Sequence, residues 1–122
     1  PLAATCTPAS GVVLRALPRP DAFIAAVGAF TPQMVELGPE LCRHVAAHGR
    51  ILLDARDAEH EAGDLLQAGL AVAGLPTLGD VVTAGEAPRR GPVLFKSCGW
   101  AGWDLAAARC ALQTLAGSAK GR

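Results

Sequence analysis

Four short segments of this chain are apolar at nearly every position, and this pattern restricts the fold more than any other feature. They span Leu2–Thr7, Asp21–Val27, Arg50–Asp54 and Val93–Lys96. A strand that is apolar on both sides, rather than at alternate positions, is typical of a parallel sheet with helices on both of its faces. We therefore expect each segment to form a buried strand.

Segments with helical character separate these expected strands. Pro39–Ala47 has proline in its first turn and Gly49 after it, and Leu78–Ala84 follows a Pro-Thr turn. We also expect helices over 57–68, where Gly63 weakens the middle, and over 100–116. Strands and helices alternate at the spacing of βαβ units, which predicts an α/β fold with a mainly parallel sheet. Residues 85–92 are expected to form a polar loop and 117–122 a frayed end.

Composition excludes several classes of partner. The 122 residues carry 11 Lys and Arg against 11 Asp and Glu, so the formal net charge is zero and no basic stripe for nucleic acid is present. Gly, Pro or charge interrupts every apolar stretch before it is long enough to cross a membrane, and we expect no membrane association. The first ten residues lack the pattern of a secretory signal, which favours a cytoplasmic location.

The four cysteines, Cys6, Cys42, Cys98 and Cys110, show no CxxC motif or nearby CxH pair. This spacing disfavours both a zinc site and a disulfide framework, so we expect reduced and mostly buried thiols. The chain also begins on apolar residues without a Met, as part of a larger domain would.

Residues that directly follow the expected strands are the candidates for ligand contacts, because ligands bind beyond the carboxyl ends of the strands in an open parallel sheet. Thr5-Cys6-Thr7-Pro8 follows the first apolar run, and Ala26-Val27-Gly28-Ala29-Phe30 follows the second. A glycine and small residues would let a flat ring or a pyrophosphate approach the backbone, and the threonines would add hydroxyl donors. The alternative is that Gly28 only makes a turn and the threonines only favour strands.

A second candidate lies where the last strand leads into the last helix. Ser97 is a suitable N-cap residue, and free backbone N–H groups in the first helical turn could hold a carboxylate or a phosphate, with Lys96 adding charge. The alternative is a capped helix with a solvated lysine. Trp100 and Trp103 share a helical face with Ala107, Ala111 and Leu115, and this stripe is more typical of packing than of a stacking platform.

Other signals for chemistry are weak. His44 and His48 are four residues apart, but no third ligand accompanies them and His48 falls beyond the expected helix end, so we expect no metal site. His60 lies in an acidic run typical of a solvated face, and Asp64 fits a charge at a helix start. The sequence contains no Ser-His-Asp order, G-x-S-x-G, P-loop or G-x-G-x-x-G motif.

Taken together, the segments AAVGAFTPQMVEL, EAGDLLQAG, LGDVV and VLFKSCGWAGWDLAAA resemble, in order and spacing, the C-terminal part of the ornithine cyclodeaminase/μ-crystallin family. The resemblance covers nearly the whole chain. It implies a homodimer with a Rossmann domain that binds NAD(H) or NADP(H). Residues 1–99 would be the C-terminal half of that domain, and 100–122 a closing helix that packs toward a substrate and dimerisation domain.

The resemblance also implies roles for individual residues. Cofactor contacts would come from Thr7 and Pro8 at one strand end, from Ala26, Val27 and Gly28 at the next, and from Ser97 near the nicotinamide carboxamide. Phe30 and Cys98 would lie beside the substrate. The dinucleotide fingerprint and the catalytic lysine and arginine of the family would precede Leu2, so no catalytic residue is assigned in this chain.

Two departures from the family pattern bear on the reaction. Phe30 replaces an aspartate that ornithine cyclodeaminases use in acid–base chemistry, and Met34 replaces a family lysine. An apolar Phe30 suits a compact cyclic imine better than the side-chain amine of ornithine. The form VGAFTP with FKSCGWAGWDLAAA most resembles the reductases of Δ1-pyrroline-2-carboxylate and Δ1-piperideine-2-carboxylate, which form L-proline and L-pipecolate.

The alternatives implied by the same family are an ornithine cyclodeaminase, which releases ammonia from L-ornithine, and a non-catalytic μ-crystallin-like protein that binds NADPH and a small ligand. The choice between NADH and NADPH is open, because the residue that reads the ribose follows the absent fingerprint.

Overall fold

The computed structural model describes residues 1–8, 10–85 and 90–119, and its centre is a parallel sheet of four strands. The strands are β1 (Leu2–Thr5), β2 (Phe23–Ala26), β3 (Arg50–Leu53) and β4 (Val93–Lys96). Their order is β1-β2-β4-β3, so the last strand is inserted between β2 and β3. This arrangement confirms the α/β class with a parallel sheet, and the strands lie within the four apolar segments.

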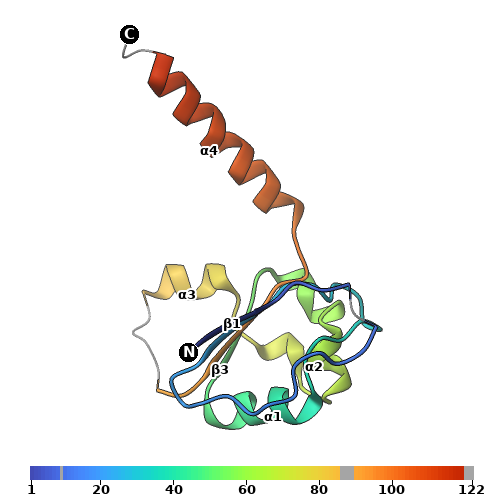
Figure 1. Ribbon diagram of the computed structural model, residues 1–122. Helices are drawn as coiled ribbons and strands as arrows, with labels where there is room; N and C mark the ends of the chain where they lie inside the picture. Colours follow the sequence, from blue (N-terminus) through green and yellow to red (C-terminus); the bar gives the residue numbers. More distant parts are fainter. Residues whose placement is uncertain (9, 86–89, 120–122) are drawn as a thin grey trace.

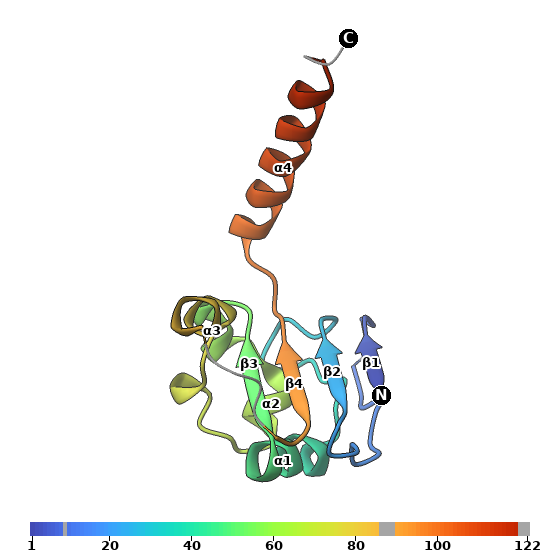
Figure 2. The same ribbon diagram turned by 90° about the vertical axis from the view of Figure 1, so that its left-hand side faces the viewer.

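Helices follow β2, β3 and β4, but no helix lies between β1 and β2 in the described residues 6–8 and 10–22, so the expected alternation is wrong at this connection. The helices are α1 (Pro39–His48), α2 (Gly63–Gln67), α3 (Leu78–Ala84) and α4 (Ala101–Ala119), with short 3-10 helices η1 (Arg56–His60) and η2 (Val72–Gly74). α1 and α2 pack behind the sheet, whereas α3 lies beside β3 (Figures 1 and 2). The long α4 rises away from the sheet, beyond the carboxyl ends of the strands (Figure 2).

One face of the sheet is buried more completely than the other. Ile24, Leu94 and Ile51 are at most 3% exposed, and they share a face with the wholly buried Ala26 and Leu53. The residues between them, such as Phe95, point to the opposite face and are only half-buried. The core therefore lies between the sheet and the α1–α2 layer. Its other members come mainly from these helices and their flanking segments: Leu37, Leu41, Cys42, Val45, Ala58, Ala62, Leu65, Ala68 and Val72.

The helix expected over 57–68 is wrong as a single element, because η1 ends at His60 and α2 begins at Gly63. A Cβ atom on Gly63 would lie 2.2 Å from the carbonyl oxygen of Met34 and 2.5 Å from that of Thr31. The break therefore lets the chain pass directly against the 31–34 loop. A glycine that looked like a weak point in a helix is required for close packing.

α3 confirms its expected bounds of Leu78–Ala84. Thr77 accepts a hydrogen bond from the backbone N–H of Asp80, and the Asp80 carboxylate accepts one from the N–H of Thr77, which makes a capping box. The helix ends at Gly85, whose φ of 60° is left-handed. Residues 86–89 of the expected 85–92 loop lie outside the described residues.

α4 begins one residue later than expected, and Trp100 rather than Ser97 precedes its first residue. The expected frayed end is wrong for 117–119, which are helical, while 120–122 lie outside the described residues. Leu105, Leu112 and Leu115 are between 54% and 68% exposed, so the apolar side chains of α4 lie in solvent in this structure. Across 1–8, 10–85 and 90–119, no helix has the length and apolar character needed to cross a membrane.

Candidate functional site at the carboxyl edge

The parallel register brings the ends of all four strands to one edge of the sheet. Thr5 is paired with Ala26, Ala26 with Lys96, and Lys96 with Leu53. The segments that follow these residues therefore meet at the edge from which α4 departs (Figure 2). This is the edge where open α/β sheets bind ligands, and it gathers most of the residues that the sequence analysis singled out.

The carboxylate of Glu36 links the ends of β1 and β2 through hydrogen bonds. One carboxylate oxygen, Oε1, accepts hydrogen bonds from the backbone N–H of Thr7 at 2.7 Å and from its hydroxyl at 2.9 Å. The other, Oε2, accepts from the N–H groups of Gly28 at 2.8 Å and Ala29 at 3.2 Å. The residue is wholly buried. Burial by itself raises the pKa of Glu36, but the hydrogen bonds from Thr7 and Gly28 outweigh it and lower the pKa below the ordinary value.

Gly28 is necessary for this arrangement. A Cβ atom there would lie 2.2 Å from the carbonyl oxygen of Thr7 and 2.4 Å from Oε1 of Glu36. The glycine therefore lets two strand ends and a buried carboxylate meet. Gly28 therefore does more than make a turn, which was the alternative expectation.

A buried ion pair between Asp64 and Lys96 lies next to Glu36. Asp64 Oδ1 accepts from the backbone N–H groups of Glu36 at 2.6 Å and Leu37 at 2.8 Å, and Asp64 Oδ2 lies 3.0 Å from Lys96 Nζ. Lys96 also donates to the carbonyl oxygen of Ala29 at 2.5 Å. Both charged side chains are buried. The expectation that Lys96 adds charge to an anion site or is solvated is therefore wrong, because its ammonium group is held inside the fold.

The carboxylate of Asp54 accepts hydrogen bonds in a similar way at the ends of β3 and β4. Its Oδ2 accepts from the hydroxyl of Ser97 at 2.6 Å and from the N–H groups of Cys98 at 3.0 Å and Gly99 at 2.9 Å. Its Oδ1 accepts from the N–H of Ala55 at 2.8 Å. These N–H groups were expected to be free for a bound anion. That expectation is wrong, because the carboxylate of Asp54 already takes the position of the anion.

The remaining expected site residues differ in their accessibility. Val27 is 41% exposed and Phe30 is 55% exposed, and Pro8 is also exposed. Ala26 is wholly buried, and its carbonyl oxygen accepts from the N–H of Ser97. Cys98 is half-buried, and burial raises the pKa of its thiol to about 11. The thiol is therefore protonated near neutral pH and behaves as a small, nearly apolar group.

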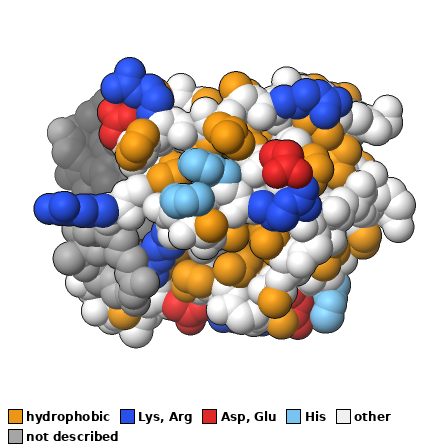
Figure 3. All heavy atoms as spheres, turned by 90° about the horizontal axis from the view of Figure 1, so that it is seen from below, with side chains coloured by type: hydrophobic (Ala, Val, Ile, Leu, Met, Phe, Trp, Pro, Cys, Tyr) orange, Lys and Arg blue, Asp and Glu red, His pale blue; other side chains and the backbone are white. Residues whose placement is uncertain are grey.

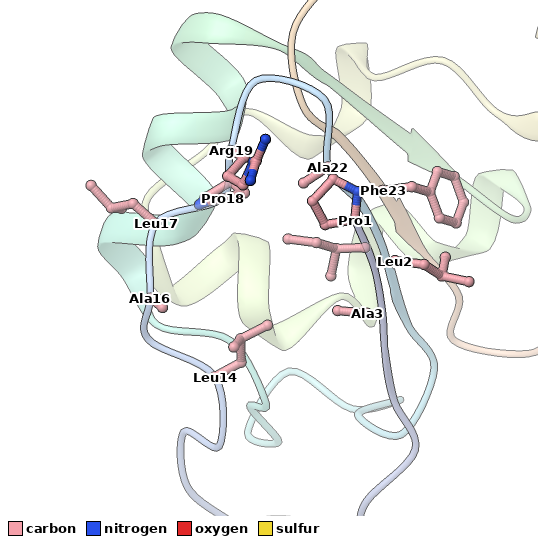
Figure 4. A pocket seen from close by; sticks show the side chains of 11 residues that line it. Pro1, Leu2, Ala3, Leu14, Ala16, Leu17, Pro18, Arg19, Ala22 and Phe23 are labelled. Atoms are coloured by element: carbon pink, nitrogen blue, oxygen red, sulfur yellow. The ribbon is translucent and has the colours of Figure 1, made fainter.

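Two hollows lie near these elements. One, of about 350 Å³, is at the carboxyl edge, where Asp54 and Ala55 meet Thr77, Trp100 and Trp103. The second, of about 170 Å³, lies beside the edge strand β1 and is lined by apolar side chains such as Leu14 and Ala22, with Arg19 at its rim (Figure 4). Only the first is near the polar groups described above.

Among the residues that the structure describes, the other titratable side chains do not form a site. The rings of His44 and His48 stack with their centroids 4.5 Å apart, and His48 is the last residue of α1 rather than beyond its end. Figure 3 views this end of the molecule and shows Lys and Arg side chains scattered among apolar ones, not gathered in a stripe. Within the part of the chain that the structure describes, no three His, Cys, Asp or Glu residues are close enough to hold a metal ion.

The cysteines are free, as expected, but not mostly buried. Cys42 is buried and Cys98 is half-buried, whereas Cys6 and Cys110 are exposed. The two tryptophans contact each other edge-to-face, with centroids 5.7 Å apart, and both are exposed.

Sequence reasoning missed two of the three buried carboxylates, Glu36 and Asp54; it placed Asp64 correctly at a helix start but not in a buried ion pair. Glu36 stands alone between Val35 and Leu37, and Asp54 ends an apolar strand. An acidic residue within or directly after an apolar run is expensive to bury unless it accepts several hydrogen bonds. That signal was available for Glu36 and Asp54, but it does not reveal which donors they hold.

Comparison with known proteins agrees with the expected family. The chain is 39% identical over 112 residues to a Δ1-pyrroline-2-carboxylate/Δ1-piperideine-2-carboxylate reductase of Azospirillum brasilense, and 38% identical over 112 residues to Δ1-pyrroline-2-carboxylate reductase 2 of Burkholderia ambifaria. The resemblance to the ornithine cyclodeaminase/μ-crystallin family is confirmed. These matches cover 92% and 91% of this chain. The chain spans about a third of the length of each relative, 35% and 34% respectively.

A solved structure of a probable ornithine cyclodeaminase from Bordetella pertussis has a similar fold, with a TM-score of 0.59. It is 24% identical to the chain and is matched over 80% of this chain and 33% of its own length. No protein-family model matches the chain. The fold is thus Rossmann-like, as the resemblance implied.

Proposed function

We propose that this chain forms the nicotinamide side of an NAD(P)H-dependent reductase of cyclic imino acids. The reaction would convert Δ1-pyrroline-2-carboxylate or Δ1-piperideine-2-carboxylate to L-proline or L-pipecolate. The observation that carries the proposal is the identity of 38–39% over more than nine-tenths of this chain to proteins with that named activity. The substitution of Phe30 for the cyclodeaminase aspartate supports a reductase over an ammonia-releasing enzyme.

The carboxyl edge fits the nicotinamide end of a dinucleotide better than its phosphates. Backbone N–H groups that could bind a phosphate, those of Gly28, Ala29, Cys98 and Gly99, already donate to Glu36 or Asp54. A second negative group would compete with these buried carboxylates. A flat ring would instead meet hydroxyl groups and exposed apolar surface, such as that of Val27.

The residues that would hold the cofactor are those expected from the resemblance: Thr7, Pro8, Ala26, Val27, Gly28 and Ser97. For Ala26, which is wholly buried, the contribution would be to the backbone that supports Ser97. The cofactor supplies a hydride for the carbon of the C=N bond, while the nitrogen gains a proton. The chain's own contribution would be position and the exclusion of water, because Phe30 and the protonated Cys98 present apolar surface to the substrate.

Residues 1–99 would form the C-terminal half of the dinucleotide-binding domain, and 100–122 would pack on a substrate and dimerisation domain in a cytoplasmic homodimer. The exposed leucines of α4 support this division, because an isolated helix with so much apolar surface gains stability only from packing. We propose either NADH or NADPH as cofactor.

The test is an assay of the full-length protein with Δ1-pyrroline-2-carboxylate and with Δ1-piperideine-2-carboxylate, in which the oxidation of NADPH and of NADH is followed at 340 nm. We expect imine-dependent oxidation of at least one cofactor. Ammonia release from L-ornithine would instead identify a cyclodeaminase. Tight NADPH binding without turnover of either imine would identify a binding protein of the μ-crystallin type.

A further inference from the structure

Two hydroxyl groups at the carboxyl edge have their protons committed to buried carboxylates. The Thr7 hydroxyl donates to Glu36 at 2.9 Å, and the Ser97 hydroxyl donates to Asp54 at 2.6 Å. Both residues are half-buried, so each hydroxyl lies between the fold and the edge. A hydroxyl has one proton and two lone pairs, so a group whose proton is taken can only accept further hydrogen bonds.

Both carboxylates are fixed in place as acceptors, so the two hydroxyl protons stay directed at them. Glu36 is wholly buried and also accepts from three backbone N–H groups, those of Thr7, Gly28 and Ala29. Asp54 is 4% exposed and also accepts from three, those of Ala55, Cys98 and Gly99. Because an ionised carboxylate can only accept hydrogen bonds, each hydroxyl directs its proton toward the carboxylate and away from the edge.

We propose that Asp54 is a positioning residue that makes Ser97 a hydrogen-bond acceptor toward a bound ligand. The ligand group selected in this way is one with N–H donors, and the carboxamide of a nicotinamide ring is such a group. This inference rests on the proposed function for the identity of the cofactor. Glu36 fixes the Thr7 hydroxyl in the same way, but β2 lies between β1 and β4, so one carboxamide does not reach both hydroxyls.

The two positions differ in how much acceptor capacity remains. Ser97 Oγ also lies 3.3 Å from the N–H of Gly99, a contact that occupies part of one lone pair. Thr7 Oγ1 belongs to a residue whose backbone N–H is bound to the same carboxylate as its hydroxyl, so the whole residue is fixed by Glu36. We therefore expect Asp54 to control the direction of one hydroxyl proton, and Glu36 to control both a proton and the local backbone.

The inference is tested with two dinucleotides that differ only in N–H donors. NADP⁺ has a carboxamide, whereas its 3-acetylpyridine analogue has a ketone in the same place and offers no N–H group. Dissociation constants for both are measured on the full-length protein by calorimetry, with NAD⁺ and its analogue used instead if these bind more tightly. We expect the unmodified protein to bind the carboxamide form about tenfold more tightly, the value of one well-formed hydrogen bond.

Asp54→Ala is the decisive variant, because it removes the oxygen that accepts the Ser97 proton and lets that proton turn outward. An asparagine would not do this, since its amide oxygen would stay toward Ser97, Cys98 and Gly99, which all donate to one oxygen of Asp54. We expect the preference for the carboxamide to fall several-fold toward unity. Asp21→Ala is the matched control: it removes the same side-chain groups at the amino end of β2, where Asp21 is exposed and paired with Arg19, and should leave the ratio unchanged.

A loss of affinity for both dinucleotides alone would reflect only a loosened fold, so the ratio is the quantity that decides. Ser97→Ala provides a second route if Asp54→Ala does not fold, since it removes the acceptor and leaves Asp54 in place. An unchanged ratio in folded Asp54→Ala, or in Ser97→Ala, would overturn the inference but not the proposed function. If the unmodified protein binds neither dinucleotide, the proposed function itself is wrong and this inference falls with it.

Discussion

The sheet and the helix α4 both carry large apolar side chains, but those on the inner face of the sheet are buried and those of α4 are exposed. Around β2, β3 and β4, even a lysine and three carboxylates are buried, and each is satisfied by hydrogen bonds or an ion pair. On α4, Trp103 and the leucines at 105, 112 and 115 are 42% to 68% exposed. Apolar content alone therefore does not determine where a segment is buried. What distinguishes the sheet is a set of polar contacts between residues that are distant in the sequence.

Removing one partner of the buried ion pair should have the largest effect on the free energy of unfolding. Lys96→Met leaves the carboxylate of Asp64 buried without its partner, and we expect the free energy of unfolding of the 122-residue chain to fall by about 3–5 kcal/mol. Urea denaturation measures the change. Arg19→Met, which removes one partner of an exposed pair, should cost no more than about 0.5 kcal/mol. Similar costs for the two variants would contradict the burial of Lys96.

Gly28→Ala should be the next most costly change. Its Cβ atom would lie 2.2 Å from a backbone oxygen that cannot move without separating β1 from β2, and we expect a loss of about 3 kcal/mol. Gly11→Ala is the control, since a Cβ there meets nothing within 4 Å. Equal urea midpoints for the two alanine variants would show that the strand ends are less closely packed than described.

The dependence of stability on pH should reveal Glu36. Its folded pKa lies below the unfolded value of 4.5, so its contribution is complete above pH 4.5 and is lost as the pH falls through the folded pKa. Glu36→Gln should cost about 1–3 kcal/mol at pH 7, because backbone donors lose a charged acceptor. We expect the difference between the two proteins to shrink on acidification. A difference that stays constant from pH 7 to pH 3 would assign the stabilisation to another group.

The smallest effect is expected on α4. Leu112→Ser with Leu115→Ser removes side chains that are 66% and 68% exposed, and the free energy of unfolding of the 122-residue chain should change by less than about 0.5 kcal/mol. Leu94→Ala, at a wholly buried position, should cost about 2–5 kcal/mol. If the double variant costs as much as Leu94→Ala, α4 is packed in solution.

Much of the fold could be predicted from sequence because local patterns specify it. Continuous apolar runs located the four strands, and proline and glycine punctuation located α1 and α3. The break at Gly63 could not be predicted, since it depends on contact with the carbonyl oxygens of a loop 29 to 32 residues earlier in the chain. The start of α4 was displaced for a similar reason, because Asp54 holds Ser97 to Gly99 outside the helix.

The candidate site was predicted in location but not in chemistry. Strand ends follow from topology, so Thr7, Gly28 and Ser97 could be assigned to one edge. The direction of each hydrogen bond depends on Glu36 and Asp54, which lie 29 and 43 residues away from the hydroxyl groups that they hold. No periodicity connects such partners. For that reason the N–H groups expected to be free were assigned the wrong role, and the hydroxyls of Thr7 and Ser97 donate to buried carboxylates that the sequence did not connect to them.

The cysteines differ in burial, so the native sequence can be labelled selectively at its exposed thiols. Burial raises the pKa of the Cys42 thiol to about 12 and that of Cys98 to about 11, whereas Cys6 and Cys110 are exposed. Thiol-directed dyes react with the thiolate, so at neutral pH they should attach to the exposed pair first. One of these lies beside the carboxyl edge and the other on α4. Energy transfer between dyes at these two native positions would report the distance between the helix and the sheet in solution.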